Sequence, residues 1–440
     1  MPSAKRFRPD RAVFVLSCGL LLFLYGIAVG KYELFPYSIL EFGADSVSAV
    51  IAEGGTLTGT RPTEYLNPAR HDGNGVTVNE TGKVAPGLTF ISSFFDGGTE
   101  LRLIRADGSV VHRWPVKYST FFPHPGHIAP EQNVPKSDWN AEIHGAVPLP
   151  DGSVVFNFNY LGTARVGRCG ETQWTIPLMT HHAVTRASDG TFLIPNWRYI
   201  EDNSRHANLH PPYMDETILR ISDSGQVLSE ISILDIIYEN NYHGLLARAG
   251  STGDIIHVND VEELTADLAG AFPMFSAGDW MLSTRKGSSV LVVDPRTKRL
   301  KWYQSGPWKG QHDPDFLPTG KILIFNNNED GSESGTVFGG GNIMEVVPFS
   351  PEVTYRYGLR KGEQLYTASS GKHQPLPNGN ILVTEAKGGR VFEADPNGRI
   401  VWEFINRYDE ADVATVTEAS RYPESYFTVK DWSCSPGTGR

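Results

Sequence analysis

The sequence predicts an all-β protein built as a six-bladed β-propeller with four antiparallel strands in each blade. Glycine, proline, tyrosine and tryptophan are plentiful, with 45, 29, 17 and 9 residues among 440, whereas long amphipathic helical patterns are scarce. Asp-Gly, Asn-Gly and Thr-Gly pairs separate short apolar runs, which is typical of hairpins because glycine accepts the positive φ of tight turns. Pairs of such hairpins recur about every 55 to 60 residues, and a four-stranded unit repeated radially is a propeller blade.

The second hairpin of each repeat gives the number of blades. It often ends at a tryptophan, as in SVLVVDPRTKRLKW, and copies occur near Trp114, Trp174, Ser229, Trp302, Tyr355 and Trp402. The tryptophans are interpreted as packing groups within and between blades rather than as an aromatic cage.

The segments outside the repeats complete the predicted order. A basic N-terminus precedes the uncharged stretch AVFVLSCGLLLFLYGIAVG, which is long enough for a transmembrane helix. Since the positive charges precede it, we expect the propeller on the outer side of the membrane, periplasmic in a Gram-negative cell. A signal peptide cleaved after Ala28-Val29-Gly30 and a lipid on Cys18 are alternatives. The predicted order is a cytoplasmic N-terminus (1–11), a transmembrane signal anchor (12–30), a juxtamembrane spacer (31–85), the propeller (86–407) and a tail (408–440) that either closes the first blade or packs outside it.

Charge and cysteine content exclude several classes of protein. The net charge of -11 and a pI near 5.6 leave no basic stripe for a nucleic acid. Three cysteines exclude a disulfide framework and a four-cysteine zinc site. Cys169 and Cys434 either form a bridge in an oxidising compartment or remain thiols.

Histidines are the most regular polar feature of the repeats. His144, His182 and His312 each stand eight positions before the glycine of their turn, while His373 and His243 occupy shifted places. The first strand of each blade lines the central channel, so one repeated position at its start should bring these side chains to a common mouth. The alternatives are that each histidine merely caps its strand or that the set binds a metal.

The stretch from Asp254 to Asn328 carries a specific order of motifs. His257 and Asn259 form H-x-N, Arg285 ends S-x-R, and His312 opens Q-H-D-x-x-x-L-P-x-G-x-I-L-x-F-x-N. This succession resembles the arylsulfotransferase family, bacterial enzymes that move sulfuryl groups between phenols without a sulfonucleotide. The segment over 260–279, between the H-x-N and S-x-R motifs, departs from the family pattern and is interpreted as a lid, a dimer contact or a sign of drift.

The resemblance implies an enzyme that uses an aryl sulfate and a phenol, with no metal and no cofactor. His312 matches the histidine that accepts the sulfuryl group, and neutral imidazole suits that role. Arg285 and Asn259 would hold sulfate oxygens. His257 and His182 are candidates for acid and base, and His181 is a rival of His182 for the same place in the family pattern. His144 and His373 are candidates for substrate contacts, although the resemblance gives them no role. The alternatives are direct transfer between donor and acceptor, and a non-catalytic propeller that binds a small anion or a protein partner. The oligomeric state is not predicted.

Overall fold

The computed structural model describes residues 9–32, 61–202, 206, 208–332 and 334–434, and the chain divides into two units, Met1–Glu64 and Tyr65–Arg440. The first unit contains helix α1 (Pro9–Tyr32). Among the described residues, no helix is both long enough and apolar enough to qualify as a membrane span. The predicted cytoplasmic terminus up to residue 8 and the predicted spacer over 33–60 lie outside the described residues.

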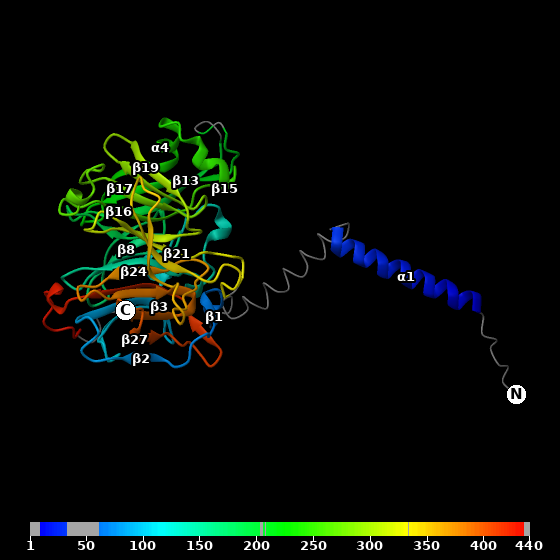
Figure 1. Ribbon diagram of the computed structural model, residues 1–440, viewed down its shortest axis with the longest axis horizontal. Helices are drawn as coiled ribbons and strands as arrows, with labels where there is room; N and C mark the ends of the chain where they lie inside the picture. The colour runs from blue at the N-terminus through cyan, green and yellow to red at the C-terminus, as the bar shows by residue number, and fades with distance from the viewer. Residues whose placement is uncertain (1–8, 33–60, 203–205, 207, 333, 435–440) are drawn as a thin grey trace. The chain divides into compact units, whose positions relative to one another are not determined.

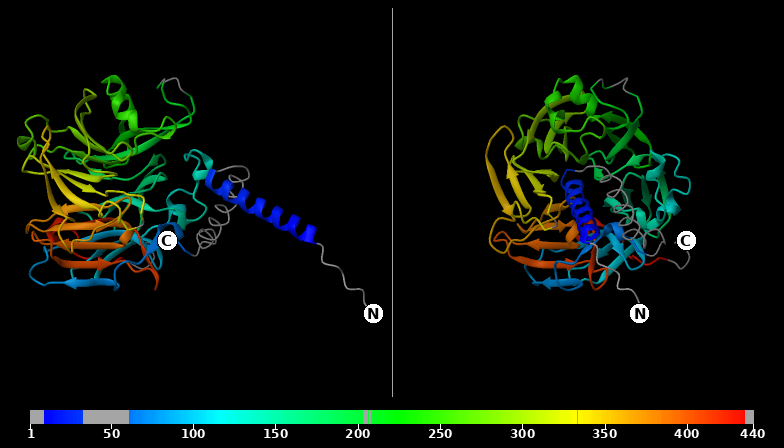
Figure 2. Two further views of the ribbon diagram at one scale, coloured as in Figure 1. Left: turned by 45° about the vertical axis from the view of Figure 1, so that its right-hand side comes forward. Right: turned by 90° about the vertical axis from the view of Figure 1, so that its right-hand side faces the viewer.

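The second unit is a six-bladed β-propeller, as predicted, with the blades following one another around a ring (Figures 1 and 2). From the channel outwards, blade 1 contains β29 (Val416–Tyr422), β3 (Leu88–Phe95), β4 (Gly98–Ile104) and β5 (Val110–Pro115). Blade 2 contains β6 (Ile143–Pro148), β7 (Val154–Phe158), β8 (Gly162–Val166) and β9 (Thr172–Ile176). Blade 3 contains β10 (Met179–Thr180) with β11 (Thr185–Arg186), then β12 (Phe192–Ile200), β13 (Tyr213–Ile221) and β14 (Val227–Ser232). In blade 3, the short strand β15 (Gly253–Asp254) also pairs with β13.

Blades 4 to 6 follow the same plan. Blade 4 contains β16 (Val258–Glu263), β17 (Trp280–Thr284), β18 (Ser289–Asp294) and β19 (Arg299–Ser305). Blade 5 contains β20 (His312–Phe316), β21 (Ile322–Asn326), β22 (Asn342–Val346) and β23 (Val353–Tyr357). Blade 6 contains β24 (Lys372–Pro375), β25 (Ile381–Glu385), β26 (Arg390–Ala394), β27 (Ile400–Ile405) and, outermost, β2 (Gly75–Asn79). Among its described residues, this unit has the α-helices α3 (Tyr118–Phe121) and α4 (Ile233–Glu239).

Both ends of the repeat region take part in closing the ring. The tail supplies β29 as the innermost strand of blade 1, antiparallel to β3, which decides between the two interpretations of the tail. The segment before the repeats supplies β2 to the edge of blade 6, and β1 (Leu66–Pro68) pairs with β28 (Asp412–Ala414). The sheets therefore extend beyond the predicted range of 86–407 in both directions. Strands from the two ends of the unit complete the sheets of the first and last blades.

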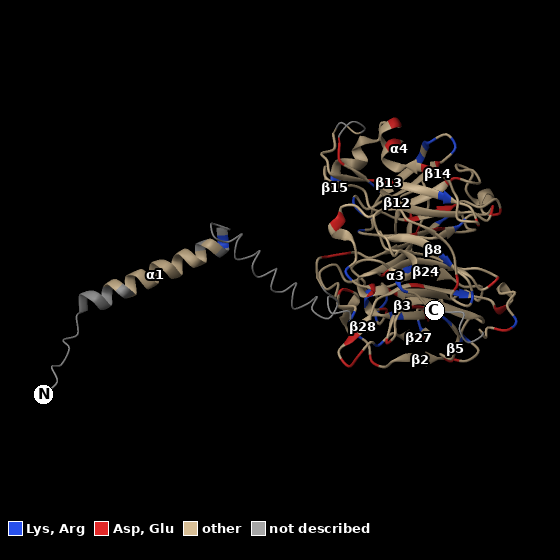
Figure 3. Cartoon of the chain, turned by 180° about the vertical axis from the view of Figure 1, so that it is seen from behind, with Lys and Arg blue, Asp and Glu red and all other residues tan. Residues whose placement is uncertain are grey.

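Apolar side chains fill the spaces between neighbouring blades. Phe90 and Trp114 of blade 1 pack with Phe156 and Phe158 of blade 2, and Trp402 of blade 6 packs against blade 1. Trp302 is also buried, in the cluster between blades 4 and 5. The tryptophans that end the hairpins are thus packing groups, as predicted, and this packing holds the inner strands around the channel. Acidic and basic residues are interspersed over the blades visible in Figure 3.

The segment over 260–279 forms the end of β16 and its connection to β17. It includes the 3₁₀ turn η5 (Ala269–Ala271), and Phe272 and Phe275 pack against Phe316 in the core between blades 4 and 5. The connection joins the end of β16 that is opposite to His257. It therefore does not occupy the position of a lid over the histidines.

A disulfide fastens the end of the described chain to blade 2. Cys169 lies in the turn between β8 and β9, its Cα is 5.6 Å from that of Cys434, and the two sulfurs are bonded. Arg168 reinforces the contact, since its Nη1 donates to the carbonyl oxygens of Asp431 and Ser433 at 2.9 and 2.6 Å. The bridged Cys434 lies twelve residues after the closing strand β29 and therefore resists withdrawal of this strand from blade 1.

We expect Cys434→Ser to lower the free energy of unfolding by roughly 2–4 kcal/mol, because the bridge restricts the unfolded chain over a separation of 265 residues. Urea unfolding without reductant measures the effect, and Cys18→Ser, which alters the one free cysteine of the described residues, is the control. Equal stability of Cys434→Ser and wild type would show that the two thiols are not bridged.

Candidate active site

Breaks in the innermost strands shape one end of the channel. The pairing of β6, β16 and β20 with their neighbours shifts register at His144, Asn259 and Asp313. In blade 3 the inner strand is divided into β10 and β11, and His182 in the gap has a φ of 52°. Bulges of this kind bend a strand and redirect its side chains. The repeated histidine position thus falls where each strand turns its side chain into the channel.

These breaks bring His144, His182 and His312 together around one small cavity of about 20 Å³, close to the volume needed for one water molecule. Each blade contributes to its wall, which consists of His144, His182, Ala183, Asn259, His312, Asp313, Ser370, Gly371, Lys372 and Thr417. The histidines at equal distance from their turn glycines are therefore neighbours in space.

His182 is the centre of a chain of aromatic contacts. Its ring centroid lies 4.1 Å from that of His144 and 4.8 Å from that of His257. Behind it, His181 Nδ1 is 2.8 Å from His182 Nδ1, and His181 Nε2 is 3.1 Å from Glu216 Oε2. His181 is fully buried and does not line the cavity, so of the two rivals His182 is the one placed to contact a bound molecule.

Burial keeps most of this cluster neutral. It lowers the pKa of His144 and of His181 to about 3, and it raises the pKa of the Glu216 carboxyl well above its ordinary value. His257 Nδ1 is 2.6 Å from Asp254 Oδ2. A carboxylate at Nδ1 holds the proton there and leaves Nε2 as the reactive nitrogen.

His312 has a defined tautomer. Its Nδ1 faces two acceptors, Asn327 Oδ1 at 2.7 Å and the Gly310 carbonyl at 3.0 Å, while its Nε2 accepts the Ser370 N–H at 3.1 Å. The orientation of the Asn327 amide is fixed in turn, because its Nδ2 donates to the carbonyls of Thr367 and Ser370 at 2.9 and 2.7 Å. Nδ1 therefore carries the proton, and the lone pair is on Nε2.

Burial also lowers the pKa of His312 to about 3, although its hydrogen bond with Asn327 acts in the opposite direction and nearby Arg285 adds to the lowering. The side chain is consequently an uncharged imidazole at neutral pH with a directed lone pair. A fixed tautomer and a neutral ring are what a nitrogen nucleophile requires.

Arg285 and Asn259 are near the histidines but already have partners. Arg285 Nη2 donates to Glu329 at 2.8 Å, and its buried Nε makes no hydrogen bond to any described residue. Asn259 Nδ2 donates to the Gln311 carbonyl at 2.8 Å, which supports the backbone just before His312. An anion that binds Arg285 at Nη2 would compete with Glu329, whereas the Nε of Arg285 is available to donate.

His373 lies apart from the other histidines. Its side chain is fully buried on β24, with Nδ1 3.2 Å from Asp313 Oδ2 and Nε2 3.1 Å from Asp315 Oδ2. It borders a second cavity of the channel rather than the one beside His312. His243, at the start of η4 (His243–Arg248), is exposed.

Most of the propeller matches the model of a known protein family. The family model of arylsulfotransferases (ASST) matches residues 145–407, which is more than half of the chain. The chain belongs to the arylsulfotransferase family. The family predicted from the motifs is therefore confirmed, and transferase activity of the arylsulfotransferase type is supported.

Other comparisons add little to the identification of this arylsulfotransferase. No curated protein sequence matches it. A protein of unknown function from Bacteroides caccae is 14% identical, with 73% of this chain and 94% of that chain covered and a TM-score of 0.47. A virginiamycin B lyase from Staphylococcus aureus is 12% identical, with 76% and 88% covered and a TM-score of 0.39. With TM-scores under 0.5, these likenesses carry no functional argument.

Several residues of this arylsulfotransferase site were not found from the sequence. Asn327 belongs to the NNNED run, which is typical of a polar loop, and nothing in it distinguishes the one amide that holds His312. Asp254 and Glu216 reach the histidines from blade 3, and Glu216 is distant from them in sequence. Asp254, three residues before His257, is the one whose spacing could have been noticed.

Proposed function

We propose that this protein transfers a sulfuryl group from an aryl sulfate to a phenol through a covalent sulfohistidine at His312, without a sulfonucleotide. The observation that carries the proposal is the state of His312, which has its proton held on Nδ1 and its Nε2 lone pair at the edge of the cavity shared with His144 and His182. Membership of the arylsulfotransferase family supports the same reaction class.

In the first step, His312 Nε2 attacks the sulfur of the aryl sulfate. A nitrogen–sulfur bond forms, the bond between sulfur and the aryl oxygen breaks, and a phenolate leaves with the electron pair. His257 gives the phenolate a proton from Nε2 in this proposal, because Asp254 faces its other nitrogen and stabilises the cationic form of the ring.

In the second step, a phenol acceptor occupies the place of the first product. Its hydroxyl oxygen attacks the sulfur, the nitrogen–sulfur bond breaks, and the lone pair returns to His312 Nε2. The hydroxyl proton goes to His257, which restores the starting state. His144 and His182, both in contact with the cavity, act as hydrogen-bond partners of the bound groups.

Arg285 is the cationic group proposed to hold the sulfuryl oxygens. Its guanidinium can present two parallel N–H donors to two oxygens, and its unpartnered Nε shows unused donor capacity. Asn259, which holds the backbone at Gln311, would contribute its second amide N–H.

The closed cavity requires a local movement before the donor can bind. About 20 Å³ does not admit a sulfate group, and the Ser370 amide covers the nucleophilic nitrogen. Ser370 and Gly371 have φ values of 59° and 113°, so this segment is held in an uncommon backbone conformation. We infer that the donor displaces Ser370 from His312.

The Cys169–Cys434 disulfide supports a working place for the propeller in an oxidising compartment outside the cytoplasm.

Turnover of a chromogenic aryl sulfate with excess phenol tests the proposed function. We expect release of the chromogenic phenol to depend on the acceptor, with the sulfated acceptor formed in equal amount. Saturable binding of the aryl sulfate without turnover would instead support the non-catalytic propeller, since the cavity would then serve to bind the anion only.

The first step should keep its rate in mild acid. Protonation removes the lone pair of His312, so the rate falls as the pH approaches the pKa of this ring, which burial places at about 3 rather than near the ordinary 6.5. Rapid-quench measurement of the phenol released in the first turnover, between about pH 5 and pH 8, should therefore show no fall in rate on acidification with a midpoint near pH 6.5. A loss centred near pH 6.5 would show that the nucleophile is a histidine with an ordinary pKa.

A further inference from the structure

A second cavity, of about 270 Å³, lies in the channel where the inner strands β6, β11, β16, β20, β24 and β29 converge. The charged groups among its described lining residues are the carboxylates of Asp260, Glu262, Asp313, Asp315 and Glu418, together with Lys372 and His373. Charges on the buried members of this set, such as Asp260 and Glu418, are costly unless they are paired.

Lys372 neutralises only part of this set. Its Nζ is 3.0 Å from Asp313 Oδ1, and it is 3.9 and 3.8 Å from oxygens of Asp260 and Glu418. One ammonium is thus shared by three carboxylates, and it does not reach Asp315 or Glu262 at ion-pair distance in the described structure. The cavity thus contains five carboxyl groups and two basic side chains.

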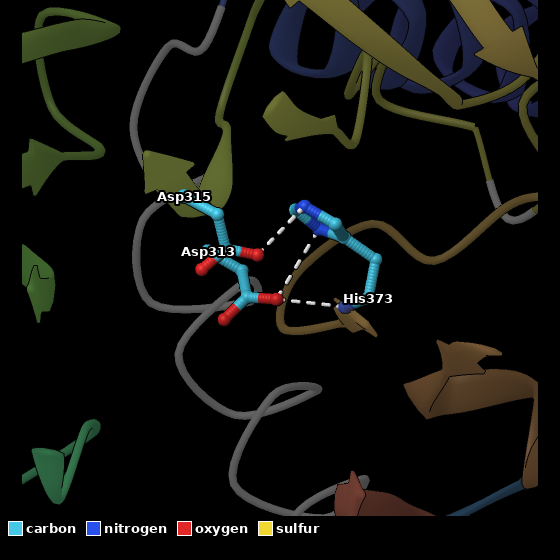
Figure 4. A group of neighbouring side chains, drawn as sticks. All are labelled: Asp313, Asp315 and His373. Carbon is cyan, nitrogen blue, oxygen red and sulfur yellow. Dashed lines mark hydrogen bonds and ion pairs between the residues drawn. The ribbon is translucent and has the colours of Figure 1, made fainter. Parts of the chain in front are cut away.

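The contacts of His373 point to a missing ligand. Its ring is fully buried between Asp313 and Asp315, which lie on β20 two residues apart (Figure 4). Both ring nitrogens are within 3.2 Å of a carboxylate oxygen, yet neither has a hydrogen-bond partner of acceptable geometry among the described residues. The ring therefore forms ion pairs with the two aspartates without a hydrogen bond of good geometry, while Asp313 Oδ2 also accepts the His373 backbone N–H at 2.7 Å. This spacing also fits groups arranged around a central ion.

The distances agree with that interpretation. One ligand atom from each of Asp313, Asp315 and His373 can be chosen so that all lie within 4.8 Å of one another. Adjacent ligands of a six-coordinate ion at about 2.1 Å are about 3.0 Å apart, and His373 Nε2 is 3.1 Å from Asp315 Oδ2.

We propose that Asp313, Asp315 and His373 form a binding site for a divalent cation in the channel of the propeller. An imidazole nitrogen with two carboxylates favours an ion that accepts both donor types, such as Mn²⁺, over Ca²⁺, which prefers oxygen alone. Lys372, Asp260 and Glu418 form the outer shell that orients Asp313.

The site is separate from the sulfuryl-transfer chemistry but adjoins it. Asp313 directly follows His312 on β20 and borders both cavities, whereas Asp315 and His373 line the second cavity and not the one beside His312. A cation held by these residues would therefore fix the strand that carries His312. The proposal does not depend on the proposed function, because the binding of an ion can be measured without any substrate.

Mn²⁺ binding to the metal-depleted full-length protein tests the site, with electron paramagnetic resonance to count free ion and calorimetry to measure affinity. We expect one Mn²⁺ per chain, and at least tenfold weaker binding in Asp315→Asn and His373→Gln, since each removes a ligand. Asp189→Asn is the matched control, because this exposed aspartate lies in the turn between β11 and β12, pairs with Arg220 and does not line the cavity. Pulsed resonance should also detect a coupled imidazole nitrogen in wild type that is absent in His373→Gln.

Failure of wild type to bind Mn²⁺ up to about 1 mM would overturn the site, and so would equal affinity in wild type and both ligand variants. Circular dichroism and thermal unfolding check that each variant is folded. Asp315 is 30% exposed, so Asp315→Asn decides the matter if His373→Gln does not fold. Turnover of the aryl sulfate, measured on the same samples, reports separately on the proposed function.

Discussion

His312→Ala should abolish sulfuryl transfer while leaving the propeller folded. If Nε2 of this residue is the nucleophile, its removal eliminates the covalent route, and loss of a nucleophile lowers kcat by on the order of 10⁴ or more. The structural cost is smaller, because the ring lies beside a cavity and its removal chiefly leaves the Asn327 amide oxygen without its donor, at about 1–3 kcal/mol. Steady-state turnover together with urea unfolding separates the two effects.

The matched control for this prediction is His243→Ala. His243 occupies a shifted place in the sequence repeat but is exposed on η4, so its removal should leave turnover unchanged. Retention of most of the activity by a folded His312→Ala protein would mean that another group accepts the sulfuryl, or that donor and acceptor react directly.

Arg285→Lys should impair transfer far more than it impairs stability. Lysine keeps the charge but loses the two parallel donors and the Nε that is free in the structure. Loss of one preorganised donor to developing charge costs about 2.7–4 kcal/mol, or on the order of 10²–10³ in kcat. The side chain is partly exposed and its described ion pair is with Glu329, so the free energy of unfolding should change by only about 1 kcal/mol or less.

Comparison of kcat for Arg285→Lys and Arg220→Lys measures this effect. Arg220 pairs with Asp189 and Glu263 at a distance from the histidines, and its replacement should leave kcat unaltered. Turnover of Arg285→Lys close to that of wild type would mean that the arginine serves to hold Glu329 rather than the sulfuryl group.

The propeller could be predicted because its signals are local. Each hairpin carries its own turn glycine and alternating apolar residues, and the outer strands β5, β9, β14, β19, β23 and β27 fall at the hairpins counted in the sequence. Closure of the ring could not be predicted in the same way. Strand β29 has its partner β3 more than 300 residues away, and no local pattern distinguishes a closing strand from a tail packed outside.

The site was predictable to the extent that it follows the repeat. His144, His182 and His312 share a position in their blades, so spacing alone brings them to one cavity. The groups that decide which ring nitrogen carries the proton come from other blades or from irregular segments. Asn327, for example, contacts His312 and is itself oriented by the carbonyl groups of Thr367 and Ser370. The surroundings of His373 could not be predicted from the repeat. This residue is shifted by two positions within its repeat, and its side chain lies among carboxylates instead of histidines.

The intact mass of the protein after exposure to an aryl sulfate without acceptor tests the central claim most directly. The protein must be kept at neutral to mildly alkaline pH, because a sulfur–nitrogen bond is labile in acid. The account predicts that wild type gains the mass of one sulfuryl group, that peptide mapping places it on His312, and that addition of a phenol removes it. An adduct that persists in His312→Ala or maps to His182 or His257 would contradict the account, as would full transfer activity with no adduct at any time.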